Sequence, residues 1–238
     1  MNDLTLITCS YNSLALMKNW YFSIKNVFAE VPNIIVCENS DDAGEQGRIM
    51  TFMLDNNIPF IQNATDDKTH AHGVRMIIPF IKTKYALLLD TDVEMLKEPS
   101  DVIHKMDEHQ DIALGGFYGK RLPNYVNRVH PWFMVMNVPI VRKANLFFNG
   151  ENSEENRRMF SPLFTKNKLN KYDVGCRFCE EAEFRGYKIL TLNKLCKDCN
   201  NGPWFRHHEG LSWCKRREND PLLKRRRGIL KEIENKNE

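Results

Sequence analysis

Short apolar runs alternate with longer amphipathic stretches through the first hundred residues, and this order restricts the possible folds more than any other feature. The runs at 4–9, 33–38, 58–61 and 85–89 are predicted strands, and the stretches at 13–28, 44–56 and 69–81 are predicted helices. Pro79 must kink or shorten the last helix, because proline has no backbone N–H. Strands that alternate with helices are typical of βαβ units, so the sequence predicts an α/β fold with a mainly parallel central sheet flanked by helices.

The second half of the chain is less regular. Strands are predicted at 111–116, 131–136 and 187–192, and a helix that Gly186 ends is predicted at 173–185. Residues 149–170 are polar and expected to be rich in loops. No internal repeat and no interdomain linker is visible, so we expect a single domain over residues 1–214 and a basic, helical C-terminal tail over residues 215–238.

The composition is that of an ordinary soluble globular protein, with 238 residues of which 42% are hydrophobic and 27% charged. The net charge of +3 is too small to demand a nucleic-acid partner. The N-terminus lacks the features of a signal peptide, and the apolar runs are too short to span a bilayer. The seven cysteines are an odd number, and Cys9 and Cys37 lie in predicted strands. A cytoplasmic protein with reduced thiols is therefore expected.

Polar residues follow three of the predicted strands. These clusters are Ser10-Tyr11-Asn12, Glu38-Asn39-Ser40 and Asp90-Thr91-Asp92. In open α/β sheets ligands bind beyond the carboxyl ends of the strands. The sequence therefore places a binding site at these three strand ends.

Asp90 and Asp92 are the predicted metal ligands. They close an aliphatic strand, and alternation along an extended segment points both carboxylates to one side with Thr91 opposite. Two oxygen ligands suit Mn²⁺ or Mg²⁺ better than zinc. A divalent ion there can neutralise a diphosphate and stabilise it as a leaving group. The alternative is a solvated turn without a metal.

Together these motifs resemble the glycosyltransferases of the Rossmann-like GT-A fold, family 2 most closely. The resemblance covers roughly residues 4–213 and rests on LTLITCSYN, NIIVCENSDD, THAHGVR, DTDV and YDVGCRFCEEAEFRGYKI. It implies a nucleotide-diphosphate sugar donor, Mn²⁺ or Mg²⁺ as cofactor, a glycan, lipid-linked or protein acceptor, and usually inversion at the anomeric carbon. It also implies a nucleotide-sugar half at about 1–95 and an acceptor half at about 96–214.

Matched position by position, the resemblance implies roles for the residues at the strand ends. The nucleotide wall corresponds to Thr8, Ser10, Tyr11 and Asn12, and the acidic residue that meets the base or ribose corresponds to Glu38, with Asn39 and Ser40 beside it. The helix start near the ribose and phosphates corresponds to His72, Gly73 and Arg75, where free backbone N–H groups favour anions. Thr91 completes this cofactor-binding set. The alternative roles are local, since Tyr11 and Asn12 can turn the chain and His70 or His72 can cap the helix.

Asp173 is the candidate catalytic base, because inverting transfer needs a carboxylate to take a proton from the acceptor hydroxyl. In many relatives the base belongs to an acidic pair two residues earlier, where this chain has Asn170 and Lys171. Either Asp173 acts in a variant motif with Val174 and Gly175, or the base lies elsewhere. The local alternative for Asp173 is an N-cap of the helix predicted at 173–185.

The segment WFRHHEGLSW at 204–213 gathers aromatic residues, two histidines and an arginine. By the same resemblance, His208 or His207 completes the metal shell and the aromatics cover the donor. A surface histidine pair supported by tryptophan is the alternative. His130 and Trp132 lie where the acceptor pocket is expected, and a core position is the alternative for Trp132.

Four cysteines have the spacing of a structural zinc site, Cys176-x-x-Cys179 and Cys196-x-x-Cys199 with sixteen residues between the pairs. Against zinc, the first pair falls inside a predicted helix. Structural Zn²⁺ and free thiols therefore both stay open.

The tail, DPLLKRRRGILKEIENKNE, is predicted to be an amphipathic helix. It either packs against the domain or brings its basic cluster to an anionic membrane, which would make the protein peripheral at a membrane surface. Two other functions compete with sugar transfer. A sugar-phosphate nucleotidyltransferase would need a glycine-rich loop after the first strand, and Ser10 to Ser13 contain no glycine. A zinc module that binds nucleic acid would leave the first hundred residues without a purpose.

Overall fold

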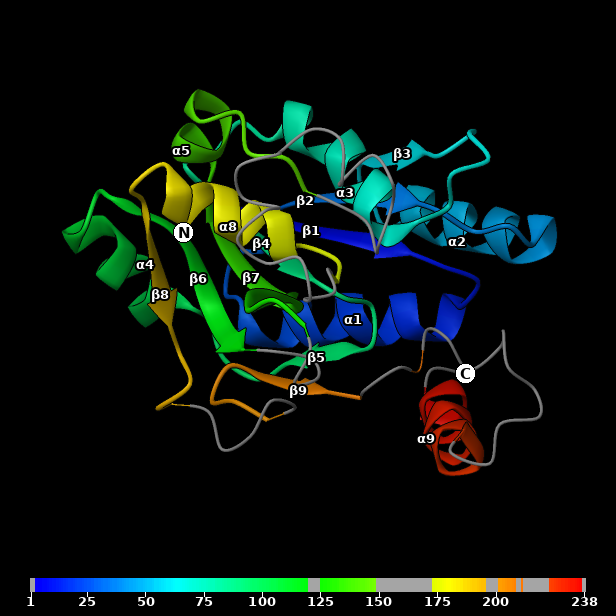
Figure 1. The fold of residues 1–238 in the computed structure, drawn as a ribbon. Helices are drawn as coiled ribbons and strands as arrows, with labels where there is room; N and C mark the ends of the chain where they lie inside the picture. The colour runs from blue at the N-terminus through cyan, green and yellow to red at the C-terminus, as the bar shows by residue number, and fades with distance from the viewer. Residues whose placement is uncertain are drawn as a thin grey trace.

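A seven-stranded, mostly parallel sheet forms the centre of the protein (Figure 1). The computed structural model describes residues 3–119, 125–148, 173–195, 201–208, 211 and 223–236. The strands of the sheet are, in spatial order, β3 (Phe60–Gln62), β2 (Asn33–Glu38), β1 (Leu4–Ser10), β4 (Tyr85–Leu89), β7 (Arg128–Asn137), β6 (Ile112–Gly119) and β8 (Lys188–Thr191). Among these, β7 alone runs antiparallel to its neighbours. The predicted α/β fold with a mainly parallel sheet is confirmed.

Helices cover both faces of the sheet and enclose two apolar cores. On one face lie α1 (Leu14–Val27), α2 (Ala43–Asp55) and α4 (Ser100–Glu108); on the other lie α3 (His70–Ile77), α5 (Val138–Lys143) and α8 (Cys176–Phe184). Figure 1 shows α3, α5 and α8 above the sheet and α1 and α4 below it. This layering buries both faces, which is why β4 is apolar throughout.

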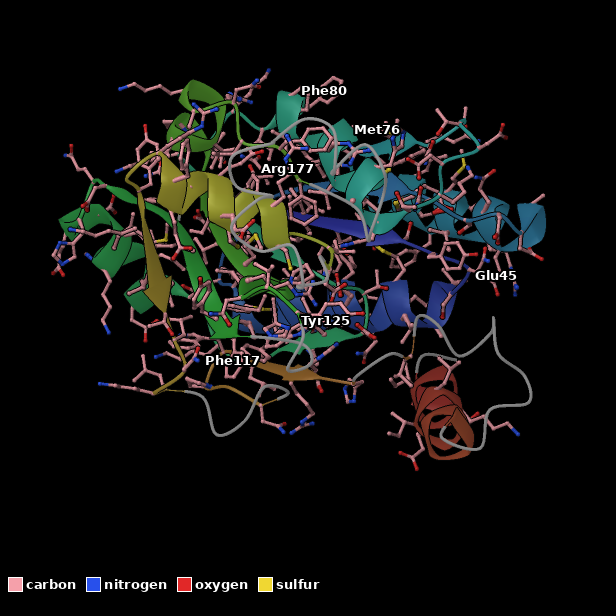
Figure 2. All side chains as sticks on the ribbon, viewed as in Figure 1. Glu45, Met76, Phe80, Phe117, Tyr125 and Arg177 are labelled. Carbon is pink, nitrogen blue, oxygen red and sulfur yellow. The ribbon has the colours of Figure 1, made fainter. Side chains whose placement is uncertain are left out.

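Three helices begin at side-chain caps that follow the strands. Ser13 Oγ accepts from Leu16 N at the start of α1, and Asp42 Oδ1 and Thr69 Oγ1 cap α2 and α3 in the same way. The cap of α1 is reinforced by Glu45, whose carboxylate accepts from Leu14 N at 3.3 Å (Figure 2). These caps start each helix next to the carboxyl edge of the sheet. Pro79 ends α3 as predicted, inside a 3₁₀ turn over Ile78–Phe80.

Some elements differ from the prediction. The helix predicted at 173–185 begins at Cys176 and ends at Phe184, because Gly175 takes a left-handed φ of 81° and is its N-cap residue. Asp173 therefore does not cap that helix. The structure also contains α4, α5 and a second, two-stranded sheet of β5 (Val93–Met95) with β9 (Phe205–His207), none of which the sequence predicted. Strands of three residues are too short to show a period in sequence.

The tail forms helix α9 (Leu223–Lys236), as predicted. In the part of the chain that the structure describes, no helix is both long and apolar enough to cross a membrane.

Gly73 lets α3 approach the sheet closely. A Cβ at this position would lie 2.7 Å from Cys9 Sγ and 3.2 Å from Cys37 Sγ, and both thiols are buried. We expect Gly73→Ala to lower the free energy of unfolding by about 1–3 kcal/mol, since a buried core cannot absorb the added methyl without strain. Gly47→Ala is the control, because nothing lies within 4 Å of its Cβ position and alanine is the better helix former. Urea denaturation of both variants checks this; equal stabilities would contradict close packing at Gly73.

Candidate donor and metal site

The parallel register of β1 and β2 places Ser10 beside Glu38 at the carboxyl edge of the sheet. Ser10 Oγ donates to Glu38 Oε2 at 2.5 Å, and Ser40 N donates to Glu38 Oε1 at 2.8 Å. Burial raises the pKa of the Glu38 carboxyl, and the hydrogen bonds from Ser10 and Ser40 partly offset this. Glu38 is fully buried, and both of its carboxylate oxygens accept hydrogen bonds from within the protein. Thr8 lies deeper in β1 and is also fully buried.

The turn after β1 is tied to the turn after β2. Asn12 adopts a left-handed φ of 46°, and its backbone N–H donates to Ser40 Oγ at 2.8 Å. The Asn12 amide and the Tyr11 hydroxyl both donate to Asp41. Tyr11 and Asn12 therefore turn the chain and remain partly exposed above the sheet edge.

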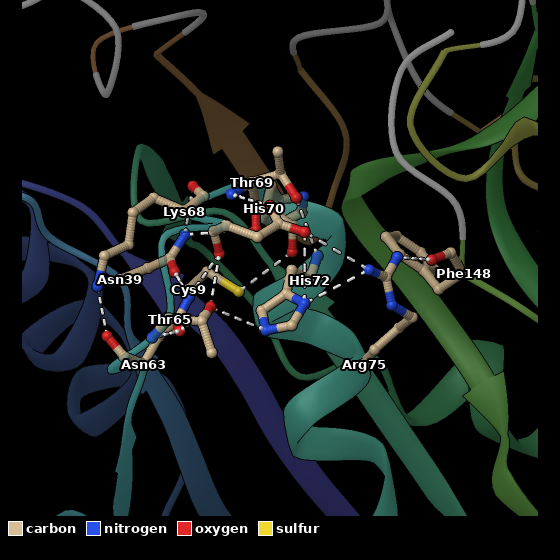
Figure 3. Close-up of polar contacts among 11 residues, drawn as sticks. Cys9, Asn39, Asn63, Thr65, Lys68, Thr69, His70, His72, Arg75 and Phe148 are labelled. Atoms are coloured by element: carbon tan, nitrogen blue, oxygen red, sulfur yellow. Dashed lines mark hydrogen bonds and ion pairs between the residues drawn. The ribbon is translucent and has the colours of Figure 1, made fainter. Parts of the chain in front are cut away.

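Asn39 joins the end of β2 to the loop that precedes α3 (Figure 3). Its amide donates to Lys68 O at 2.7 Å and its carbonyl accepts from Asn63 Nδ2 at 2.6 Å. Lys68 Nζ in turn donates to Asn63 O. This buried network fixes the path of the loop toward the start of α3.

His72 and Arg75 project from α3 toward Asp67 (Figure 3). His72 Nδ1 lies 3.4 Å and Arg75 Nη2 lies 3.8 Å from Asp67 Oδ2. Arg75 Nη1 also donates to Phe148 O at 2.9 Å. Both side chains pair with Asp67, two positions before the Thr69 cap of α3, and Gly73 is buried in the same helix.

Asp90, Asp92 and His207 come together just beyond β4, and in the described ranges they form the one group with the geometry to hold a metal ion. One ligand atom from each lies within 4.8 Å of the others. The β5–β9 pairing produces this, because it sets Val93 opposite His207. His207 Nε2 then lies 3.5 Å from Asp92 Oδ1. Thr91 is buried between the two aspartates.

The two carboxylates have oxygens that suit a cation. Asp90 Oδ1 and Asp92 Oδ1 are buried, and neither has a hydrogen-bond partner within the described residues. Buried polar atoms are rarely left in this state without water or an ion. Two carboxylate oxygens and an imidazole nitrogen are also a suitable donor set for Mn²⁺. The residues present therefore fit a divalent cation.

His70 is a member of the site that sequence reasoning had treated only as a helix cap. Its Nε2 lies 3.1 Å from Asp90 Oδ1. Burial acts to raise the pKa of Asp90, but His70, His207 and Arg128 lower it overall, so the carboxylate stays charged. The sequence could have indicated this role through the position of His70, because it directly follows the Thr69 cap at the carboxyl edge of the sheet.

Of the two candidate histidines, His207 lies with the aspartates and His208 does not. His208 Nε2 is 3.5 Å from Glu94 Oε2, while its backbone N–H donates to Asp92 O at 2.9 Å. The structure thus favours the second of the two histidines named from the sequence.

Trp132 packs behind His207. The two rings stack with centroids 5.1 Å apart and planes 22° apart, and His130 stacks on Trp132 with centroids 5.3 Å apart. The ring centroids of Phe117 and His130 are 5.5 Å apart. Burial lowers the pKa of His130 to about 3, so its ring is neutral. Trp132 and His130 thus support His207 from behind. Because both are buried, they expose little surface to an acceptor.

Asp173 forms a buried ion pair with Arg128 of β7. Arg128 Nη2 lies 2.7 Å from Asp173 Oδ2, and each side chain is less than a tenth exposed. Arg128 also donates to Val174 O, and Val174 N donates to Asp173 Oδ1 at 2.8 Å. Burial lowers the pKa of His130, and Asp173 acts in the opposite direction.

Cys176 and Cys179 are buried thiols that bond to the backbone. Cys176 Sγ donates to Val126 O, and Cys179 Sγ accepts from Val129 N at 3.2 Å. Burial raises the pKa of Cys176 to about 11 and that of Cys179 further, so both are protonated. Zinc binds thiolates, and the described residues give it no support. Cys196 and Cys199 lie outside the described residues.

No family model matches the sequence, and no curated protein matches it either. Solved structures do match. TarS 1–349 of S. aureus is 15% identical with a TM-score of 0.54, over 90% of this chain and 63% of that one. The mannosyltransferase PcManGT of Pyrobaculum calidifontis, solved with GDP-Man and Mn²⁺, is 10% identical with a TM-score of 0.56, over 90% of this chain and 60% of that one. The chain thus spans less than two thirds of either. This similarity shows the fold, which is the GT-A fold that the sequence motifs indicated.

Proposed function

We propose that the chain is a metal-dependent glycosyltransferase that moves a sugar from a nucleotide-diphosphate donor to an acceptor hydroxyl. The observation that carries this proposal is the group of Asp90, Asp92 and His207, whose two buried carboxylate oxygens lack hydrogen-bond partners in the described part of the chain. The group lies at the carboxyl edge of a mainly parallel sheet, where such folds bind ligands. A structural neighbour that is a mannosyltransferase solved with GDP-Man and Mn²⁺ supports the same class of reaction.

In this proposal Asp90, Asp92 and His207 hold Mn²⁺ or Mg²⁺. When bound, the ion neutralises the diphosphate that leaves as the sugar is transferred. His70 lies 3.1 Å from Asp90 and lowers the pKa of its carboxyl, which favours the charged form. Trp132 stacks on His207 and keeps its ring facing Asp92.

The donor would lie over the ends of β1 and β2. The wall there would consist of the partly exposed Tyr11 and Asn12 and the buried Ser40. Glu38 and Asn39 would support this wall from below. The partial positive charge of the α3 N-terminus and the guanidinium of Arg75 would attract phosphate oxygens, with His72 beside them.

Asp173 is the proposed base. Arg128 pairs with its carboxylate and orients it, and in this role the carboxylate would accept the proton of the acceptor hydroxyl during an inverting attack. The acceptor class, and contact of the basic tail with a membrane surface, stay predictions from the sequence alone.

A thermal-shift screen of nucleoside diphosphates and nucleotide sugars, with and without Mn²⁺, tests the proposal. A ligand that binds only the native state at 100 times its dissociation constant adds about 2.7 kcal/mol of stability. We expect such a gain only when Mn²⁺ and the correct nucleotide are present together, and its loss in EDTA. Equal stabilisation without any metal would contradict the metal assignment, and no response to any nucleotide would contradict the donor class.

A further inference from the structure

We infer that the C-terminal helix α9 positions the metal site by anchoring Leu211, whose backbone N–H holds the carboxylate of Asp92. This inference rests on the proposed metal function of Asp92. The buried residues of α9 pack in a cluster with Leu16 and Leu211, and none of them belongs to the group that can hold a metal. The effect of α9 would therefore pass through Leu211.

The backbone of His208 and of Leu211 contacts Asp92, in the turn between β4 and β5. Leu211 N donates to Asp92 Oδ2 at 3.0 Å, and His208 N donates to Asp92 O at 2.9 Å. His207 pairs with Val93 across the small sheet. His207 is thus one proposed metal ligand, and the backbone of His208 and Leu211 holds another, Asp92.

The bond from Leu211 determines which oxygen of Asp92 faces the cation. With Oδ2 occupied by Leu211 N–H, Oδ1 is the oxygen that lies 3.5 Å from His207 Nε2 and lacks a hydrogen-bond partner among the described residues. A hydrogen bond to a ligating carboxylate restricts its rotation and raises metal affinity, and such outer contacts are commonly worth about 10–100-fold.

The Leu211 side chain is held by α9. It is 1% exposed and packs in a small apolar cluster with Leu16 of α1 and with Leu230 and Ile233 of α9. Figure 1 shows α9 outside the sheet layers, below the start of α1. This cluster is separate from the two cores on the sheet, so it depends on the packing of α9. Losing those contacts would free Leu211 and release the hydrogen bond to Asp92.

The test compares two double variants of α9. Leu230→Ala with Ile233→Ala removes the buried contacts, whereas Lys231→Ala with Glu232→Ala changes exposed positions of the same helix. Mn²⁺ affinity is measured by electron paramagnetic resonance of free Mn²⁺, on protein shown to be folded by circular dichroism. We expect about 10–100-fold weaker binding in the first variant and wild-type binding in the second. Wild-type affinity in both would overturn the inference while leaving the proposed function intact.

Hydrogen exchange gives a readout that does not depend on metal. The Leu211 amide should exchange faster in the Leu230→Ala, Ile233→Ala variant than in wild type, and unchanged exchange would overturn the inference. If the double variant fails to fold, Ile233→Val provides a milder loss of the same contact. Failure of the wild-type protein to bind Mn²⁺ would instead overturn the proposed function, and the exchange rates alone would then decide whether α9 anchors Leu211.

Discussion

Replacing Asp92 with asparagine is expected to abolish sugar transfer and to weaken Mn²⁺ binding by more than about 100-fold. Losing a residue that only supports a metal ligand commonly weakens metal binding by about 10–100-fold, and losing a ligand should cost more. The amide carries no charge, so the cation loses half of its carboxylate pair. The fold should persist, because the amide oxygen can still accept the hydrogen bond from Leu211 N. Titration calorimetry with Mn²⁺ and a donor-dependent transfer assay measure the two effects.

Glu94→Gln is the matched control for this variant. Glu94 lies two residues further along the chain and pairs with Arg206 and His208, outside the group that can hold a metal. Neutralising it should leave Mn²⁺ affinity unchanged. Full turnover by Asp92→Asn, or an equal loss in both variants, would show that Asp92 is no specific metal ligand.

Replacing Asp173 with asparagine is expected to have two separable effects. Transfer should fall by about 10²–10⁴-fold, the usual contribution of a general base, while Mn²⁺ and donor binding remain. Stability should also fall by about 3–5 kcal/mol, because Arg128 would be left buried without its counter-charge. Single-turnover kinetics and urea denaturation measure the two effects.

A second variant separates catalysis from structure. Arg128→Met combined with Asp173→Asn removes both charges, and replacing a buried pair in this way is often neutral for stability. We expect stability to return and transfer to stay low. A stable double variant with wild-type transfer would reduce Asp173 to a structural partner of Arg128. Asp111→Asn is the control for ion-pair loss in general, since its pair with Lys188 is exposed and should matter far less.

The sequence alone determined the first half of the fold. Strands β2 and β4 have the predicted bounds, and the helices predicted at 13–28 and 69–81 begin at the side-chain caps Ser13 and Thr69. These features are local, because apolar periodicity and capping act over a few residues. For the same reason the sequence identified Asp90 and Asp92 as neighbours at a strand end, and the structure places them beside a histidine.

Only the tertiary structure identified the third member of the group that can hold a metal. Pairing between β5 and β9 joins three residue pairs, of which the central pair, Glu94 with Arg206, is 112 positions apart, and no local pattern sets that register. Adjacent side chains on a strand face opposite sides, so a slip of one residue would exchange His207 and His208. Long-range contacts likewise buried Trp132 behind His207 and paired Asp173 with Arg128. Local sequence thus determined where the aspartates lie, and the packing of distant segments determined which side chains meet them.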